Sequence, residues 1–226
     1  MAHGHAWPPL LAYGLSLGTM NLAFYMALRT IPLGVAVALE FSGPLAVSAI
    51  ASRRLSHFAW LALAVAGLLL LLPFHVTSAS LDPEGVGFAL AAGGCWALYI
   101  VCGQRAGAAH GVTASAWGLL IGSLVAVPIG IAFDGRHLFS PAVLPRGLAV
   151  AVLASALPYT LEMYGLRRLP ARVFGTLMSL EPVIAAIAGL VFLHEHLTSV
   201  QWMAIGAVMI ASLGTTAGAE PGPRAT

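Results

Sequence analysis

Two glutamates stand beside prolines within stretches that are otherwise apolar. Glu40 lies four residues before Pro44, and Glu181 lies directly before Pro182. On insertion scales a charged side chain at the centre of a membrane helix costs about 2.5–3.5 kcal/mol, so such a residue usually faces the protein interior and marks an ion or substrate path. A buried carboxyl is a binding group for a proton or an ammonium ion, and we infer such a role for both glutamates.

The prolines add a second polar feature to each position. Proline has no N–H, so Pro44 cannot donate to the carbonyl of Glu40 and Pro182 cannot donate to the carbonyl of Met178. The Ser179 hydroxyl lies close to the second break. Carboxyls and freed carbonyls at one depth predict a polar pocket. The alternative is that both acids are structural and are hydrogen-bonded across helices.

Two further polar residues belong to the predicted pathway. Glu162 follows Pro158 by four residues in another apolar run. It lies closer to the end of that run, so pairing with Arg167 or Arg168 is its alternative role. Asn21 sits within the first apolar run, where an amide forms an interhelical hydrogen bond more often than it binds a ligand.

The composition identifies a membrane protein. The 226 residues are 59% hydrophobic and 8% charged, with a mean hydropathy of +0.92. Soluble domains carry about 25% charged residues. The ten basic residues are all arginines and form no long basic run, so we expect no nucleic-acid partner.

Enzymatic and ATP-driven functions find no support in the motifs. The two aspartates, Asp82 and Asp134, fall in predicted loops, which excludes a buried aspartyl pair, and no glycine-rich phosphate loop is present. The run from His194 to His196 lacks the spacing of two ligands on one helix face. We therefore expect no enzyme activity, no cofactor and no metal site.

A membrane-spanning helix needs about 20 apolar residues. Eight runs meet this requirement and predict an all-α polytopic membrane protein with short connections. The predicted spans are 9–28, 33–52, 57–74, 85–103, 113–133, 144–166, 171–193 and 198–216. The tail 217–226 is rich in proline and glycine, which predicts a disordered segment.

The arginines set the expected orientation. With a cytoplasmic N-terminus, seven of the ten arginines fall on the cytoplasmic side and three on the outside. Cytoplasmic loops carry an excess of basic residues. We therefore predict that both termini are cytoplasmic.

The stretch 28–44 recurs at 166–182, with six identities in 17 ungapped positions. The identical pairs are Leu28/Leu166, Arg29/Arg167, Pro32/Pro170, Val35/Val173, Leu39/Leu177 and Pro44/Pro182. The two copies lie five spans apart, so they face opposite ways across the membrane. Inverted repeats with broken helices are typical of secondary transporters, whose substrate sites lie near the bilayer midplane.

Two GxxxG motifs, 14–18 and 118–122, predict close helix packing within the chain, with homodimerisation as the second interpretation.

Four runs together resemble one transporter family. They are PLGVAVALEFSGP (32–44), CWALYIVCGQRAG (95–107), LPYTLE (157–162) and RVFGTLMSLEP (172–182). They are similar to the bacterial threonine/homoserine exporters of the EamA group, within the drug/metabolite transporter superfamily. The resemblance extends from about Tyr13 to Gly214.

This resemblance implies a ten-helix inner-membrane carrier of two inverted five-helix units that exports small amino acids or related metabolites, with protons as the expected coupling ion. Glu40, Glu162 and Glu181 match acids in the family motifs. The first two family helices have no counterpart here. We therefore expect residues 9–74 to form an incomplete first repeat of three helices, and residues 85–216 to form a complete second repeat.

We predict a secondary transporter that exports threonine, homoserine or related metabolites by proton-coupled alternating access. The bilayer and a small-molecule substrate are its expected partners. Two alternatives stay open. One is a non-transporting remnant or a partner subunit of a full-length carrier, and the other is a carrier of a different metabolite.

Overall fold

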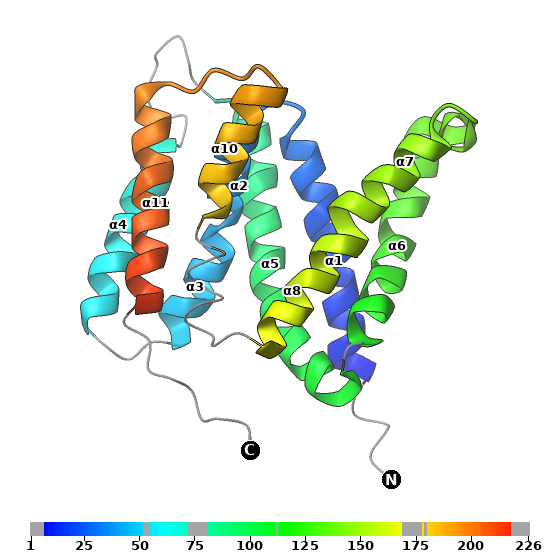
Figure 1. Ribbon diagram of the computed structural model, residues 1–226, viewed down its shortest axis with the longest axis horizontal. Coiled ribbons are helices and arrows are strands. Elements are labelled where there is room, and N and C mark those ends of the chain that lie inside the picture. Colours follow the sequence, from blue (N-terminus) through cyan, green and yellow to red (C-terminus); the bar gives the residue numbers. More distant parts are fainter. Residues whose placement is uncertain are drawn as a thin grey trace.

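The described part of the computed structural model is a bundle of helices (Figure 1). It covers residues 7–51, 55–71, 81–111, 113–168, 178 and 180–217. The α-helices are α1 (Trp7–Ala27), α2 (Leu33–Glu40), α3 (Ser42–Ala51), α4 (Leu55–Leu71), α5 (Pro83–His110), α6 (Thr113–Asp134), α7 (Leu144–Val150), α8 (Leu157–Arg168), α10 (Glu181–Phe192) and α11 (Ser199–Ala217). A 3₁₀ turn, η2 (Gly135–Phe139), follows α6, and a π-helical segment, η3 (Ala151–Ala156), joins α7 to α8. The all-α prediction is confirmed.

Within the described residues, four helical stretches are long and apolar enough to cross a membrane: Trp7–Ala27, Pro83–His110, Thr113–Phe133 and Leu144–Glu162. Shorter apolar helices occupy Leu33–Val47, Glu181–Phe192 and Ser199–Gly214. Helix α4 falls on the remaining predicted span, 57–74, but residues 72–74 lie outside the described part. The first residues of the predicted span 171–193 also lie outside it, as does the tail 218–226.

The predicted span 33–52 is two helices. Helix α2 ends at Glu40, Phe41 forms a turn, and α3 begins at Ser42. Pro44 stands in the first turn of α3, where a missing N–H is tolerated. The proline-broken helix expected from the sequence is therefore present, with its break one residue after the acid.

The two GxxxG motifs pack against each other. A Cβ added at Gly18 of α1 would lie 2.5 Å from the Gly122 carbonyl oxygen of α6, and one added at Gly14 would lie 2.5 Å from Ile121 Cβ. Only glycine at these positions allows the backbones to approach so closely. The prediction of close packing within the chain is confirmed.

Two pairs of helices pack with their directions opposed. In the α2–α10 pair, Gly34 lies against Ala186 and Gly189 lies near Leu33. The second pair is α4–α11, where Gly67 lies against Ala204 and the Trp60 indole covers Gly214. Figure 1 shows both pairs on the side of the bundle away from α6 and α7.

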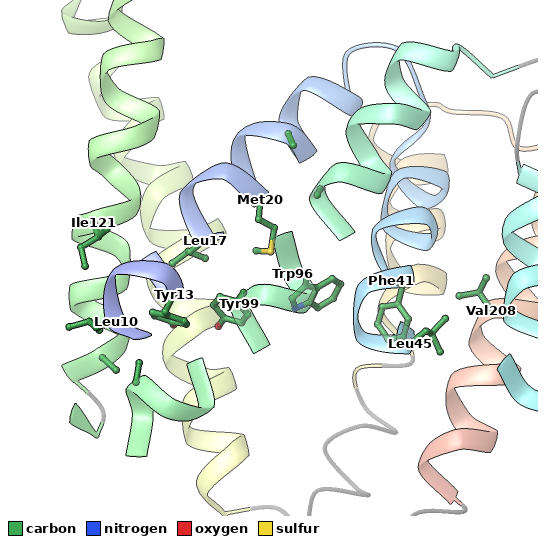
Figure 2. Packing of buried hydrophobic residues seen from close by; sticks show 14 of the residues in the cluster. Leu10, Tyr13, Leu17, Met20, Phe41, Leu45, Trp96, Tyr99, Ile121 and Val208 are labelled. Carbon is green, nitrogen blue, oxygen red and sulfur yellow. The ribbon is translucent and has the colours of Figure 1, made fainter. Parts of the chain in front are cut away.

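A series of buried aromatic side chains connects the two sides of the bundle. Figure 2 shows Tyr13, Tyr99, Trp96 and Phe41 following one another through the buried cluster. Tyr13 and Tyr99 stack with ring centroids 4.9 Å apart, and Phe41 meets Trp96 edge to face at 5.6 Å. Such aromatic pairs contribute about 0.5–1.5 kcal/mol each beyond the area that they bury.

Candidate functional site

Glu40 occupies the break between α2 and α3. Its side chain is only 8% exposed, and it stands at the last position of a helix whose other residues from Gly34 onward are also buried. The Glu40 carbonyl faces α5, because a Cβ added at Gly93 would lie 2.7 Å from this oxygen. The carbonyl that Pro44 leaves without a helix donor therefore lies at the contact with α5.

Glu181 begins α10 and is followed by the buried Pro182 in the first turn. The Glu181 carboxylate therefore lies at the N-terminal end of α10, where the helix macrodipole favours negative charge. The Glu181 side chain itself is exposed, so the burial predicted for both acids holds for Glu40 and is wrong for Glu181. Ser179, the hydroxyl expected beside this break, lies outside the described residues.

A hydrogen bond between α1 and α8 lies close in sequence to Glu162. Glu162 lies on α8, one turn beyond Tyr159. Asn21 of α1 donates from Nδ2 to the Tyr159 hydroxyl at 3.0 Å and to the Leu17 carbonyl at 2.9 Å. The interhelical hydrogen bond predicted for Asn21 is therefore present. The side chains at 167 and 168 lie outside the described set, so the pairing of Glu162 with an arginine stays an alternative.

Four of the polar residues predicted from the sequence line a single cavity. It has a volume of about 580 Å³, within the range of small-molecule sites of about 300–1,000 Å³. Asn21, Glu40, Glu162 and Glu181 all line it, and Pro44 and Pro182 do not. The two prolines therefore shape the helices that carry the acids and do not face the cavity. Its wall comes from α1, α2, α5, η3, α8 and α10, together with Met178.

The charge of the cavity has one sign. Three carboxyls line it, and no basic side chain appears among the described residues of its wall. Carboxylates that share a space of low polarity repel one another more strongly than they would in water. A bound cation relieves this repulsion, and so does a bound proton. The cavity is therefore suited to a ligand with an ammonium group.

The remaining wall is largely apolar and aromatic, and most of it has no direct signal in the sequence. It includes Met20, Phe24, Tyr25, Trp96 and Ile184. Trp96 has two roles, because it packs on Phe41 and also lines the cavity. The Asn21–Tyr159 hydrogen bond joins residues 138 positions apart, a contact that only the fold brings together.

Glu195 has a structural role that the sequence did not indicate. Its carboxylate accepts hydrogen bonds from the Leu33 backbone N–H at 2.9 Å and 3.1 Å, one to each oxygen. Leu33 is the first residue of α2, so Glu195 satisfies a free N–H of that helix. The carboxylate also contacts the position that a Cβ at Gly189 would occupy. This contact ties the connection after α10 to the start of α2.

An apolar helical bundle with an acid-lined cavity beside interrupted helices is typical of a membrane transporter. A sequence model of the EamA-like transporter family matches residues 83–217, more than half of the chain. The chain belongs to the EamA-like transporter family. It is a multi-pass protein of the inner membrane that acts on a small-molecule substrate, and it is not an enzyme.

Individual relatives narrow the comparison within this family. The chain is 55% identical over 208 residues to the threonine/homoserine exporter RhtA of Escherichia coli K12 and to that of Salmonella typhimurium LT2, and each alignment covers 92% of this chain and 70% of the relative. The uncharacterized transporter YwfM of Bacillus subtilis is 27% identical over 217 residues, covering 92% of this chain and 73% of YwfM. No solved structure gives a significant match.

Proposed function

We propose that this protein exports small amino acids of the threonine and homoserine class across the inner membrane. Its 55% identity to proteins named as threonine/homoserine exporters supports the substrate class. The observation that carries the proposal is the cavity in which Glu40, Glu162 and Glu181 meet without a basic side chain in the described wall.

The substrate ammonium binds between Glu40 and Glu181 in this proposal. These two acids stand at the breaks of α2 and α10, which pack with opposed directions. An ammonium group bonded to both carboxylates offsets their repulsion and uses its three donors. The apolar wall around Met20, Phe24 and Trp96 then receives the side chain of the amino acid.

Transport proceeds by alternating access, with protons as the coupling ion. A proton that binds an acid after the substrate leaves restores the charge balance of the cavity on the return step. One elementary charge crossing 100 mV is worth about 2.3 kcal/mol, which sustains substantial accumulation outside.

The two repeats are the units that move against each other during transport. Helix α2 lies in the first copy of the repeated stretch and α10 begins at the end of the second, while α4 and α11 follow them in the two halves. We assign residues 9–74 and 85–216 to the two repeats, which rock against each other about the cavity. Pro44 and Pro182 keep the broken helices in place during this motion.

The proposed topology places both termini in the cytoplasm. Helix α1 begins and α11 ends at the same end of the bundle, the lower end in Figure 1. The distribution of arginines then selects the cytoplasm for that end. The exposed apolar side chains of α6 and α7 contact lipid in this arrangement.

Two alternative functions remain, and the efflux experiment described below distinguishes them from the proposed one. A carrier of a different metabolite shares the cavity and differs in cargo. A non-transporting component inserts into the membrane and acts through a full-length partner. The GxxxG faces of α1 and α6 contact each other within the chain, so the homodimer stays a prediction that would use another surface.

The proposal is tested by efflux of labelled threonine and homoserine from cells that express the chain. We expect faster efflux than from cells with an empty vector, and loss of this gain when the proton gradient is collapsed. Insertion of the protein without efflux of either compound would refute the proposed substrate class. A screen of other small amino acids would then separate a different cargo from a non-transporting component.

A further inference from the structure

Three tyrosines from three helices form a row that leaves the cavity. Tyr159 of α8 lines the cavity, and its ring centroid lies 6.2 Å from that of Tyr99 on α5. Tyr99 in turn stacks on Tyr13 of α1 with ring centroids 4.9 Å apart. Figure 2 shows the two rings next to each other. Neighbouring tyrosine rings therefore lead from the cavity wall at Tyr159 to Tyr13, which lies where α1 packs against α5 and α6.

The cavity end of the row is tied to the acids. Tyr159 accepts a hydrogen bond from Asn21, so its own O–H is free to donate elsewhere. Glu162 is close enough to interact electrostatically with Tyr13, Tyr99 and Tyr159. Among the three tyrosines, Glu40 interacts in this way with Tyr159 alone, so Glu162 is the acid of the cavity that all three tyrosines share.

The other end of the row reaches a buried hydroxyl. The Tyr13 hydroxyl lies within reach of those of Tyr99 and Ser115. Ser115 Oγ is buried and makes no hydrogen bond of regular geometry within the described part of the chain, and the same is true of His110 Nε2. Buried polar atoms without a partner are rare, and each calls for an explanation such as a bound water or a functional role.

These unpartnered atoms mark the end of the bundle where α1 begins. His110 is the last residue of α5, and its ring lies 6.1 Å from that of Trp7, the first residue of α1. Ser115 lies in the first turn of α6. The row therefore extends from the cavity toward one membrane surface.

The surroundings of the row hold its members in place. Tyr13 is 3% exposed and Tyr99 is 7% exposed. The Tyr13 ring lies between Gly103 and Gly118, and a Cβ at either glycine would press on it. Glycine at these two positions thus makes room for a phenol ring between α5 and α6.

We propose that Tyr159, Tyr99, Tyr13 and Ser115 form a proton path between Glu162 and the end of the bundle where α1 begins. The proposal rests on the proton coupling of the proposed function. Each hydroxyl accepts a proton on its oxygen and passes its own proton to the next group, and rotation of the O–H groups resets the row. One proton moves along the row and no group keeps a charge. With cytoplasmic termini, the row releases the proton from Glu162 to the cytoplasm.

This path separates the proton from the substrate. Glu162 shares the cavity with Glu181 of α10 and Glu40 of α2, and no basic group in the described wall of the cavity competes for its charge. Glu40 and Glu181 can then hold the ammonium while Glu162 exchanges a proton with the row. The row lies outside the cavity apart from Tyr159, so Tyr99 and Tyr13 pass protons without contacting the substrate.

The test uses Tyr99→Phe and Ser115→Ala in the full chain reconstituted into vesicles. Both changes remove one hydroxyl and keep the packing. Two rates are measured with labelled threonine: transport driven by a pH gradient, and exchange of threonine for threonine without a gradient. We expect both variants to lower gradient-driven transport by at least about tenfold, as for the loss of a proton-transfer group. Exchange stays at the wild-type rate, because it moves no net proton.

Ser123→Ala is the matched control. Ser123 lies on α6, and its hydroxyl donates to the Leu120 carbonyl of its own helix at 2.7 Å. This variant keeps both rates. Gradient-driven transport at the wild-type rate in Tyr99→Phe and Ser115→Ala would overturn the proton path. Equal loss of both rates would also overturn it, because the row would then serve folding or substrate binding. If the wild-type protein shows no response to the gradient, the proton coupling of the proposed function fails instead.

Discussion

The α1–α6 and α2–α10 contacts use the same kind of small residues but differ in whether the helices continue past the contact. Each brings two helices together at small residues, Gly18 against Gly122 in the first pair and Gly34 against Ala186 in the second. Along α1 and α6 the contact is part of helices of 21 and 22 residues. Helix α2 stops at Glu40 and α10 starts at Glu181, so the second contact ends in two helix termini that carry acids beside the cavity.

The difference shows how one packing device serves two purposes. Small residues allow close approach in membranes, where helix association depends on van der Waals contact and hydrogen bonds. The α1–α6 pair is continuous and forms one long, close contact. A pair interrupted at mid-length leaves backbone and carboxyl groups to be satisfied, and such irregular backbone is tolerated in a membrane where it lines a cavity.

The largest expected effect comes from removing the charge at the α2 break. Glu40→Gln keeps the size of the side chain and abolishes proton-dependent efflux, because the amide neither binds a proton nor attracts an ammonium. Insertion stays intact. The measurement is labelled threonine efflux with and without a proton gradient, normalised to the amount of protein in the membrane.

Glu84→Gln is the matched control for this change. Glu84 is an exposed acid in the first turn of α5 and does not line the cavity. We expect this variant to retain efflux. Wild-type efflux from Glu40→Gln, or an equal loss from Glu84→Gln, would contradict the special role of the acid at the break.

The next effect concerns the close contact between α1 and α6. Gly18→Ala places a Cβ 2.5 Å from the Gly122 carbonyl oxygen, and this backbone contact cannot be relieved by a rotamer change. Overpacking of this kind costs about 1–3 kcal/mol. We expect a lower thermal unfolding temperature in detergent. Gly94→Ala on α5 is the control, because a Cβ there meets nothing within 4 Å, and equal destabilisation by the two changes would rule out the tight contact.

A smaller effect is expected where α10 is tied to the start of α2. Glu195→Ala removes the acceptor of the Leu33 N–H, and loss of a helix-capping acceptor costs about 0.5–2 kcal/mol. Glu195→Gln keeps one acceptor oxygen and should lose less. Thermal unfolding of both variants measures the difference. No loss of stability in Glu195→Ala would show that the contact contributes nothing.

The smallest effect is expected from the hydrogen bond between α1 and α8. Asn21→Ala removes the donor to the Tyr159 hydroxyl, and interhelical hydrogen bonds in membrane proteins average about 0.6 kcal/mol. A double-mutant cycle with Tyr159→Phe isolates the pair. A coupling energy of zero would mean that the two side chains are neighbours without a stabilising contact.

The sequence predicted the helices and singled out acids that line one cavity, for physical reasons. Long apolar runs must form helices in a bilayer, because the backbone finds no other hydrogen-bond partner there. Prolines at fixed positions identified the breaks near Glu40 and Glu181, and the cost of burying charge identified the acids. These are local signals that a single chain carries.

The cavity wall and the tyrosine row could not be predicted in this way. Tyr13, Tyr99 and Tyr159 come from three helices, and their contact depends on crossing geometry that apolar composition does not specify. The apolar helices have hydrophobic residues on all sides, so periodicity does not reveal their inner faces. Glu195 was equally hidden, since its partner is a backbone N–H 162 residues away.

The most direct test of the acid pair is the binding of labelled threonine to the purified protein in detergent. We predict saturable binding to the wild-type protein and to Glu84→Gln, and no saturable binding to the double variant Glu40→Gln/Glu181→Gln. A double variant that still folds, as shown by its thermal unfolding, and binds threonine with wild-type affinity would contradict the claim that the acids at the two helix breaks hold the ammonium of the substrate.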